Sequence, residues 1–180
     1  PEHASWLFSP LQRVYAGLAA DHLEDDYLAV HPTNIVIPTD IANIPAGLTY
    51  AQDGDTITVL PGVYESSGPG SEYLDFAGKA VLLRSTGGPE VTTLTSWDYC
   101  IRFMSGEGPG SVLDGFTVSV AYSPLYGGIQ CTNGSSPTLR NLVFTENSTG
   151  LSLDEAASPT VTNCRFTGNS NYSGAGLRCG

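Results

Sequence analysis

The sequence contains very little positive charge. Its 180 residues include 7 lysines and arginines against 18 aspartates and glutamates, which gives a formal net charge of -11, and Lys79 is the only lysine. A chain with this balance repels phosphate backbones and anionic lipid surfaces. We therefore expect neither a nucleic acid nor an anionic membrane surface as its partner.

Long hydrophobic runs and clustered cysteines are also lacking. No stretch of 18 apolar residues occurs, so we expect no membrane span. The start, PEHASWLF, has neither the basic region nor the long apolar region of a signal peptide. The low lysine content with abundant Gly, Ser, Thr and Asn is common in secreted bacterial proteins, and we expect an extracellular or cell-surface location. The four cysteines have no Cys-x-x-Cys spacing, which argues against a zinc site or a thioredoxin-type motif.

A repeat of 22 residues is the strongest pattern present. SSPTLRNLVFTENS (135–148) returns as ASPTVTNCRFTGNS (157–170), and LDGFTV (113–118) aligns with the first half of both. The apolar residues of these segments form three columns, which are Leu113, Leu139, Val161; Phe116, Leu142, Cys164; and Val118, Phe144, Phe166. From the second column to the third, apolar and polar positions alternate, which predicts a strand with one buried face. The three-residue step from the first column to the second predicts a bend between them.

Further apolar pairs extend the repeat over most of the chain. Ile57 with Val59, and Val81 with Leu83, continue the same columns upstream. A second strand recurs at Leu74 and Phe76, Ile101 and Phe103, Ile129 and Cys131, Leu151 and Leu153, and Leu177 and Cys179. Glycines precede three of these pairs, at Gly128, Gly150 and Gly176, where we expect turns. Equivalent positions return after 22 to 28 residues, with one step of 35 between Val81 and Phe116.

This spacing predicts a parallel β-solenoid. At about 3.3 Å per residue, 22 residues make a loop of roughly 70 Å, and stacked loops would pair their strands about 4.8 Å apart. A single unit cannot bury its apolar face, so stacking creates the core. A β-sandwich, the competing all-β fold, would not explain columns that repeat over whole segments. We predict about five to six coils.

Three segments resemble the opening coils of the secreted right-handed parallel β-helix proteins, the pectate-lyase-like superfamily. They are IPAGLTYAQDGDTITVLPGVYES (44–66), DFAGKAVLLRSTGGPEVTTL (75–94) and SVLDGFTVS (111–119), and the resemblance covers about residues 35–180. It implies a short helix that caps the barrel before the first strand. Asp40 to Gln52 fits this place, with Asp40 as its N-cap and Pro45 near its start.

The chain is thus predicted to have three parts. Residues 1–33 form an N-terminal extension that is partly helical, because Leu11, Val14, Tyr15, Leu18 and His22 would share one face of a helix after Ser9-Pro10. Residues 34–53 form the cap segment, and residues 54–180 form the parallel β-helix. The apolar face of the extension would pack either on its own barrel or on another molecule.

The resemblance implies two kinds of catalytic site. Lyases of the superfamily use an arginine or lysine beside calcium-binding carboxylates, whereas its hydrolases use paired carboxylates. Lys79, Asp114 and Arg140 would lie on successive coils, where a salt-bridged ladder is expected rather than a calcium site. The pairs Asp53-x-Asp55 and Asp154-Glu155 fall at turns where solvated acids are ordinary, and all three histidines precede the repeats. We expect no catalytic residue, metal site or cofactor, with calcium as the alternative.

Other residues indicate binding or structural roles. Tyr122, Tyr126 and Tyr172 lie in variable loops on one side of the solenoid, where they could stack on sugars or only shield the barrel. Asn141 and Asn163 occupy the bend one coil apart and could form an amide ladder or bind a ligand.

The cysteines can be placed from the same columns. Cys131 and Cys179 would face inward two coils apart, about 9.6 Å, which exceeds the roughly 7 Å limit for a disulfide. Both are therefore predicted to be buried thiols. A bridge between Cys164 and Cys179 is open, and Cys100 is expected to face outward.

The last residues, GLRCG, fall within a predicted coil that no capping element covers. Leu177 and Cys179 would then lie at an exposed assembly end. We expect an extracellular structural or surface module that associates through this end, either with itself, for example as a filament subunit, or with a further β-helix coil. The alternative is a polysaccharide lyase or hydrolase, or a carbohydrate-binding module of a secreted protein.

Overall fold

The computed structural model describes residues 33–65, 74–120, 127–170 and 175–180. These residues form one short helix, α1 (Ile44–Tyr50), and sixteen strands. The strands are β1 (Asn34–Ile37), β2 (Thr56–Val59), β3 (Gly62–Glu65), β4 (Leu74–Asp75), β5 (Leu82–Ser85), β6 (Thr92–Ser96), β7 (Ile101–Phe103), β8 (Val112–Asp114), β9 (Thr117–Val120), β10 (Gly127–Cys131), β11 (Thr138–Arg140), β12 (Val143–Thr145), β13 (Thr149–Leu153), β14 (Thr160–Thr162), β15 (Arg165–Thr167) and β16 (Leu177–Cys179). The predicted extension lies outside the described residues apart from its final position.

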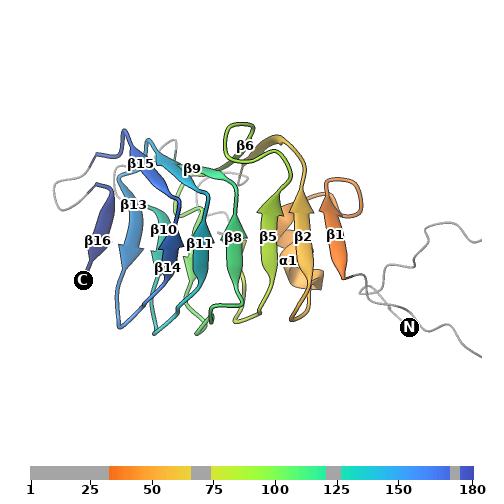
Figure 1. Cartoon of the computed structure of the whole chain (residues 1–180), viewed down its shortest axis with the longest axis horizontal. Coiled ribbons are helices and arrows are strands. Elements are labelled where there is room, and N and C mark those ends of the chain that lie inside the picture. The colour runs from red at the N-terminus through yellow and green to blue at the C-terminus, as the bar shows by residue number, and fades with distance from the viewer. Residues whose placement is uncertain (1–32, 66–73, 121–126, 171–174) are drawn as a thin grey trace, which may run out of the picture. The chain divides into compact units, whose positions relative to one another are not determined.

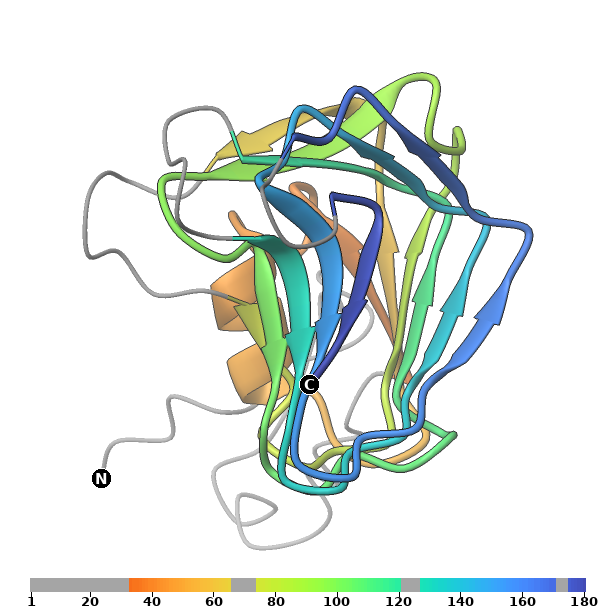
Figure 2. The same ribbon diagram turned by 90° about the vertical axis from the view of Figure 1, so that its left-hand side faces the viewer.

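The strands build three parallel sheets that surround a common interior (Figures 1 and 2). The first sheet has the order β1-β2-β5-β8-β11-β14, the second β3-β6-β9-β12-β15 and the third β4-β7-β10-β13-β16. From β2 onward, the chain visits the sheets in the same rotation, so each coil adds one strand to each sheet. This arrangement confirms the predicted parallel β-solenoid. In the described residues, no helix is long and apolar enough to cross a membrane.

The register of neighbouring coils confirms most of the predicted columns. Leu139 pairs with Leu113 on one side and with Val161 on the other, and Phe144 pairs in the same way with Val118 and Phe166. In the third sheet, the predicted apolar pairs from β4 to β16 also lie in register.

The upstream alignment was wrong by two residues. Ile57 pairs with Leu83 rather than with Val81, and Leu83 pairs in turn with Leu113. Val81 lies before β5 and is fully buried. Because Ala80, Val81, Leu82 and Leu83 form an unbroken apolar run, period-two alternation could not decide which of them lies in the column. The predicted 35-residue step is therefore absent.

The interior is filled by stacked aliphatic and aromatic side chains. Phe76, Phe103, Phe116 and Phe144 are fully buried. The rings of Phe144 and Phe166 stack with centroids 4.6 Å apart and an interplanar angle of 2°. The repeat thus places identical flat side chains at the spacing of paired strands, where they pack face to face.

The corners between sheets use the left-handed backbone region. Gly115, Asn141 and Asn163, at the predicted bend, have φ values of 83°, 54° and 50°. At the corner after the third sheet, Asn133-Gly134 in one coil is replaced by Glu155-Ala156 in the next, and all four residues have positive φ. Glycine and asparagine tolerate this region, whereas alanine adopts it at a cost.

The glycines before the apolar pairs of the third sheet were predicted to lie in turns, but two of them lie inside strands. Gly128 and Gly150 lie inside β10 and β13, without positive φ. A Cβ on Gly128 would lie 2.8 Å from the Gly150 carbonyl oxygen and 2.9 Å from a Val118 methyl carbon. A Cβ on Gly150 would lie 2.9 Å from the ring of Phe166. These glycines therefore let neighbouring backbones and side chains approach closely.

Helix α1 covers the interior at the first coil. Its buried residues are Ile44, Gly47 and Leu48, and Gly47 lies against Ile37 of β1. Ile37 has no exposed surface. Strand β1 lies within the segment predicted as the cap, yet it pairs along its length with β2 as the first strand of the sheet.

The predicted N-cap of this helix was wrong. Asn43 is the N-cap, and its side-chain oxygen accepts a hydrogen bond from the Ala46 N–H at 2.9 Å. Pro45 lies in the first turn, as expected. Asp40 instead accepts a hydrogen bond from the Val36 N–H at 2.8 Å. The Asp40 carboxylate thus closes a turn after β1, and the helix begins only after Asn43.

Truncation of the stacked phenylalanines tests the core. Phe144→Ala should lower the free energy of unfolding by about 3–5 kcal/mol, because it opens a cavity between two coils. Phe166→Ala should cost clearly less, because Phe166 is only half-buried. Chemical denaturation followed by circular dichroism measures both. Equal losses from the two variants would contradict the described packing.

Substitution at the strained corner should stabilise the protein. Ala156→Gly removes the cost of a left-handed alanine at φ 61° and should raise the free energy of unfolding by about 1 kcal/mol. Ala157→Gly is the matched control, since Ala157 is not among the residues with positive φ. A thermal melt that shows no gain for Ala156→Gly over the control would contradict the corner geometry.

Candidate functional site

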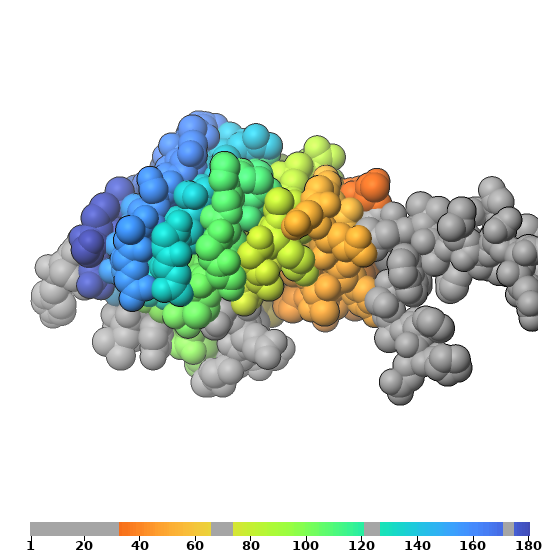
Figure 3. All heavy atoms as spheres, turned by 90° about the horizontal axis from the view of Figure 1, so that it is seen from below, coloured from red at the N-terminus to blue at the C-terminus, as the bar shows by residue number. Residues whose placement is uncertain are grey.

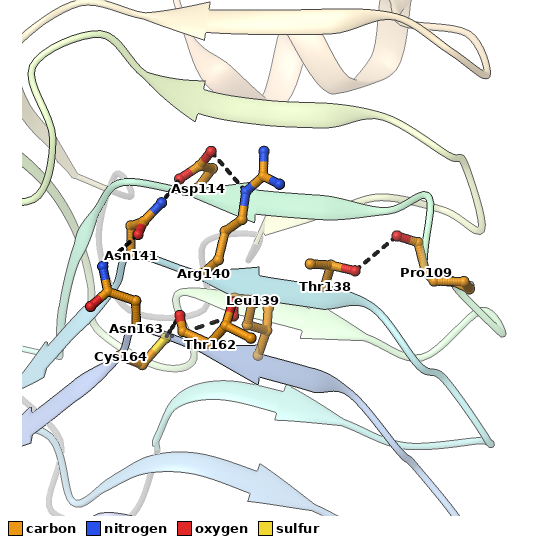
Figure 4. Close-up of polar contacts among 9 residues, drawn as sticks. All are labelled: Pro109, Asp114, Thr138, Leu139, Arg140, Asn141, Thr162, Asn163 and Cys164. Atoms are coloured by element: carbon orange, nitrogen blue, oxygen red, sulfur yellow. Dashed lines mark hydrogen bonds and ion pairs between the residues drawn. The ribbon is translucent and has the colours of Figure 1, made fainter.

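A row of polar side chains crosses the first sheet at its corner with the second (Figure 4). Arg140 donates from Nε to Asp114 Oδ2 at 2.9 Å, and Asn141 donates from Nδ2 to Asp114 Oδ1 at 2.6 Å. Asn163 donates from Nδ2 to Asn141 Oδ1, also at 2.6 Å. The structure therefore brings Asn141 and Asn163 together in one chain of hydrogen bonds that begins on a carboxylate.

This row offers little to a metal ion or a catalytic step. Both oxygens of Asp114 accept hydrogen bonds from side chains, so the carboxylate is engaged. Among the described residues, no group of three or more His, Cys, Asp or Glu side chains could hold a metal ion. The ion pair of Asp114 and Arg140 is part-exposed, and such pairs contribute only about 0–1 kcal/mol.

Lys79 does not belong to this row, contrary to the predicted ladder. Its amine donates hydrogen bonds to the carbonyl oxygens of Leu48 and Ala51, at the end of α1. Burial lowers the pKa of Lys79, and the negative charges of nearby aspartates oppose that shift. On the preceding coil, the residue that pairs in register with Asp114 is Arg84 of β5. The lysine thus fastens the capping helix to the second coil.

The carboxylate pairs act as acceptors at corners. Asp53 accepts from the Ala80 N–H at 2.8 Å, and Asp55 accepts from the Gln52 N–H at 2.7 Å. Asp55 is buried rather than solvated as predicted, because it lies under the corner that leads into β2. In the other pair, Glu155 accepts from the Thr132 hydroxyl at 2.8 Å and Asp154 from the Ser152 hydroxyl at 3.3 Å.

Two polar features escaped the sequence interpretation. Glu107 is fully buried, and its carboxylate accepts from the N–H groups of Gly78 at 3.1 Å and Ser105 at 3.0 Å. Asn147 and Asn169 form a second amide ladder, in which Asn147 Nδ2 donates to Asn169 Oδ1 at 2.9 Å. The second feature had a signal, since these asparagines recur 22 positions apart in the repeat. Glu107 had none.

Among the described residues, no strand pairs with the outer edges of the last coil at one end of the solenoid. Strands β14, β15 and β16 are the terminal strands of the three sheets, and they surround this end in Figure 2. Figure 3 shows the coils as successive bands that finish at it. Val161 of β14 is 38% exposed and Leu177 of β16 is 50% exposed, whereas Leu139 and Leu151, one coil earlier, are fully buried. We call the surface formed by β14, β15 and β16 the open end.

All four cysteines lie in the described part of the chain and are free thiols. Cys131 is buried as predicted, and burial raises its pKa to about 12. Cys179 was predicted to be buried but is exposed, because it lies in β16 at the open end. Cys164 is half-buried and is not bridged to Cys179.

Cys100 was predicted to face outward and is instead buried. Its Sγ lies 3.4 Å from the Ser119 carbonyl oxygen and 3.6 Å from that of Leu94, and burial raises its pKa to about 12. The residue lies between β6 and β7, at a corner of the coil, where alternation within a strand no longer tells which way a side chain points.

The thiols should therefore differ sharply in reactivity. Cys179 should react with a disulfide reagent near neutral pH at close to the rate of an exposed thiol. Cys100 and Cys131 should react only after unfolding, because burial hides them and keeps them protonated. Absorbance kinetics with the native and the denatured protein, followed by peptide mapping, measure this order. Rapid native labelling of Cys100 would contradict its described position.

The predicted carbohydrate-binding tyrosines, Tyr122, Tyr126 and Tyr172, lie outside the described residues. Comparisons with known proteins bear on the fold. Residues 91–179 match the family model described as a right handed beta helix region. No curated protein and no solved structure matches the chain. The matched residues contain β6 to β16, which form stacked parallel coils. The chain is therefore a parallel β-helix repeat protein, and the right-handed family match covers its residues 91–179.

Proposed function

We propose that the chain is an extracellular structural or surface β-solenoid module that associates through its open end. Self-association, as in a filament subunit, is the form of association that the experiment below tests. The observation that carries the proposal is the gathering of three strand edges, which have no partner among the described residues, around exposed apolar side chains. Edge strands of this kind accept further strands through backbone hydrogen bonds.

The apolar side chains add a driving force to the strand edges. Val161 and Leu177 belong to columns that are fully buried one coil earlier, at Leu139 and Leu151. Full burial of a valine or leucine is worth about 1.5–3 kcal/mol relative to full exposure. A strand laid on β14 and β16 would bury the surface that both side chains still expose.

The two ends of the solenoid differ, which supports a role for one of them. At the first coil, α1 packs on Ile37 and is held by Lys79. At the open end, the described residues provide no comparable cover for Val161 and Leu177. The acidic, lysine-poor composition supports the extracellular location in our proposal. A polysaccharide-cleaving role receives less support, because the candidate carboxylates Asp53, Asp55, Asp114, Asp154 and Glu155 accept structural hydrogen bonds.

A lysine substitution at the open end tests the proposal. Val161→Lys should weaken self-association at least about tenfold, because it places a charge on the strand edge. Val91→Lys is the matched control, since Val91 is 51% exposed just before β6, a strand that has neighbours on both sides. Light scattering over a wide concentration range measures the association, and circular dichroism checks the fold.

Two results would contradict the proposal. One is strictly monomeric protein at all concentrations. The other is turnover of polyuronates or neutral glycans, with or without calcium, which would favour the enzymatic alternative.

A further inference from the structure

The corner that follows β10 holds the only Asn-Gly pair in the sequence, Asn133-Gly134. Both residues are exposed, and both have positive φ, 53° and 70°. Asparagine followed by glycine is chemically unstable in water, because a following residue without a side chain lets its backbone nitrogen reach the asparagine amide carbon. This corner therefore carries a reactive group that the proposed association does not use.

The fold turns the two reacting groups away from each other. Asn133 donates from Nδ2 to the Met104 carbonyl oxygen at 2.9 Å, so its side-chain amide reaches toward the preceding coil. Gly134 donates its backbone N–H to the Glu155 carbonyl oxygen at 2.9 Å, on the following coil. The amide carbon and the nitrogen that would attack it are thus held toward opposite neighbours. The reaction must break both hydrogen bonds.

Further hydrogen bonds fix the residues on either side of this pair. The Thr132 hydroxyl donates to Glu155 Oε2 at 2.8 Å. The Ser135 N–H donates to the Thr132 carbonyl oxygen, and the Ser135 hydroxyl donates to that of Phe103, each at 3.0 Å. Thr132 and Ser135 are both buried. Water can therefore reach the pair, but its backbone can turn only when the corner separates from Glu155.

We propose that Asn133 is a self-modification site, which deamidates when this corner opens and whose product then keeps the corner from closing as before. The contacts with Met104 and Glu155 keep the asparagine intact while the corner is closed. The chemistry needs only water as a co-reactant. It goes beyond the proposed association and does not depend on it.

The reaction has two steps. The Gly134 nitrogen forms a bond to Asn133 Cγ, the bond from Cγ to Nδ2 breaks, and Nδ2 leaves as ammonia with the proton of the Gly134 nitrogen. Water then opens the cyclic imide: its oxygen bonds to one of the two imide carbonyl carbons, the bond from that carbon to nitrogen breaks, and the nitrogen regains a proton. Opening at Cγ gives aspartate, whereas opening at the backbone carbonyl carbon gives isoaspartate.

Both products disturb the closed corner. A carboxylate can only accept hydrogen bonds, so aspartate loses the bond to Met104 and places a negative charge beside that carbonyl oxygen. Isoaspartate adds one carbon atom to the main chain, which moves the Gly134 N–H away from Glu155. The modification therefore turns a transient separation of two coils into a lasting one.

Peptide mapping by mass spectrometry of the full chain, incubated at mildly alkaline pH, tests the inference. The native protein should lose Asn133 at least about tenfold more slowly than the same chain unfolded in denaturant, because the reaction waits for the corner to open. Thr132→Val removes the hydroxyl bond to Glu155 and leaves both reacting groups in place. It should therefore speed the native reaction, and it should change nothing in denaturant.

Thr138→Val is the matched control. It removes a similar hydroxyl bond, 2.9 Å to the Pro109 carbonyl oxygen, that does not involve Glu155, so the native rate should stay unchanged. Circular dichroism checks that both variants fold. The consequence is tested separately, because Asn133→Asp should lower the unfolding midpoint more than Asn133→Gly, which loses the same hydrogen bond without adding charge and suits the positive φ.

Three results would overturn the inference. They are equal rates for the native and the unfolded protein, a native reaction of Thr132→Val no faster than that of Thr138→Val, and an Asn133→Asp variant as stable as Asn133→Gly. The first comparison uses the unchanged chain, so it holds even where a variant fails to fold. Light scattering reports separately on the proposed association, and a monomeric protein with a slow native reaction would leave the inference standing.

Discussion

Parallel pairing between successive coils is the constraint on which every other feature depends. A coil of this solenoid is too narrow to bury its own inward side chains, so Leu139 and Phe144 are covered only because coils lie on both sides of them. The same stacking brings asparagines into hydrogen-bond distance and leaves room only for glycine at Gly150. Any coil with a neighbour on one side only must expose what the others bury.

Because of this constraint, the contacts that stack the coils are also the contacts that the last coil can offer to a partner. The groups that hold Asn141 to Asn163, and Phe144 to Phe166, are the groups that the last coil presents to whatever lies on it. Backbone edges would supply affinity without sequence preference.

The repeat predicted the sheets well because strand periodicity and buried columns are local properties of each coil. Leu113, Leu139 and Val161 could be aligned from spacing alone, and the bend at Asn141 followed from the same pattern. Corners were less predictable. Coil length varies, so that Ile57, Leu83, Leu113, Leu139 and Val161 are 26, 30, 26 and 22 residues apart, and alternation stops where the chain turns. The orientation of Cys100 failed because the chain turns there, and the alignment of Val81 failed because residues 80–83 are all apolar and show no alternation.

Long-range contacts at the site were harder still. Lys79 could be placed near the first sheet, but its contact with the end of α1 depends on how the helix lies across the interior. The buried Glu107 is satisfied by N–H groups from Gly78 and Ser105, which no local pattern brings together. The exposure of Cys179 could have been predicted, because the sequence pattern already placed it in the last coil, which has a neighbour on one side only.

Residue-resolved amide hydrogen exchange of the dilute protein tests the central claim most directly. Our account predicts strong protection in β2, β11, β12 and β13, whose neighbours lie on both sides. It predicts clearly weaker protection in β14 and β16, where one edge faces solvent. Protection of β14 and β16 equal to that of β11 and β13 under dilute conditions would contradict it, because the end would then already be closed.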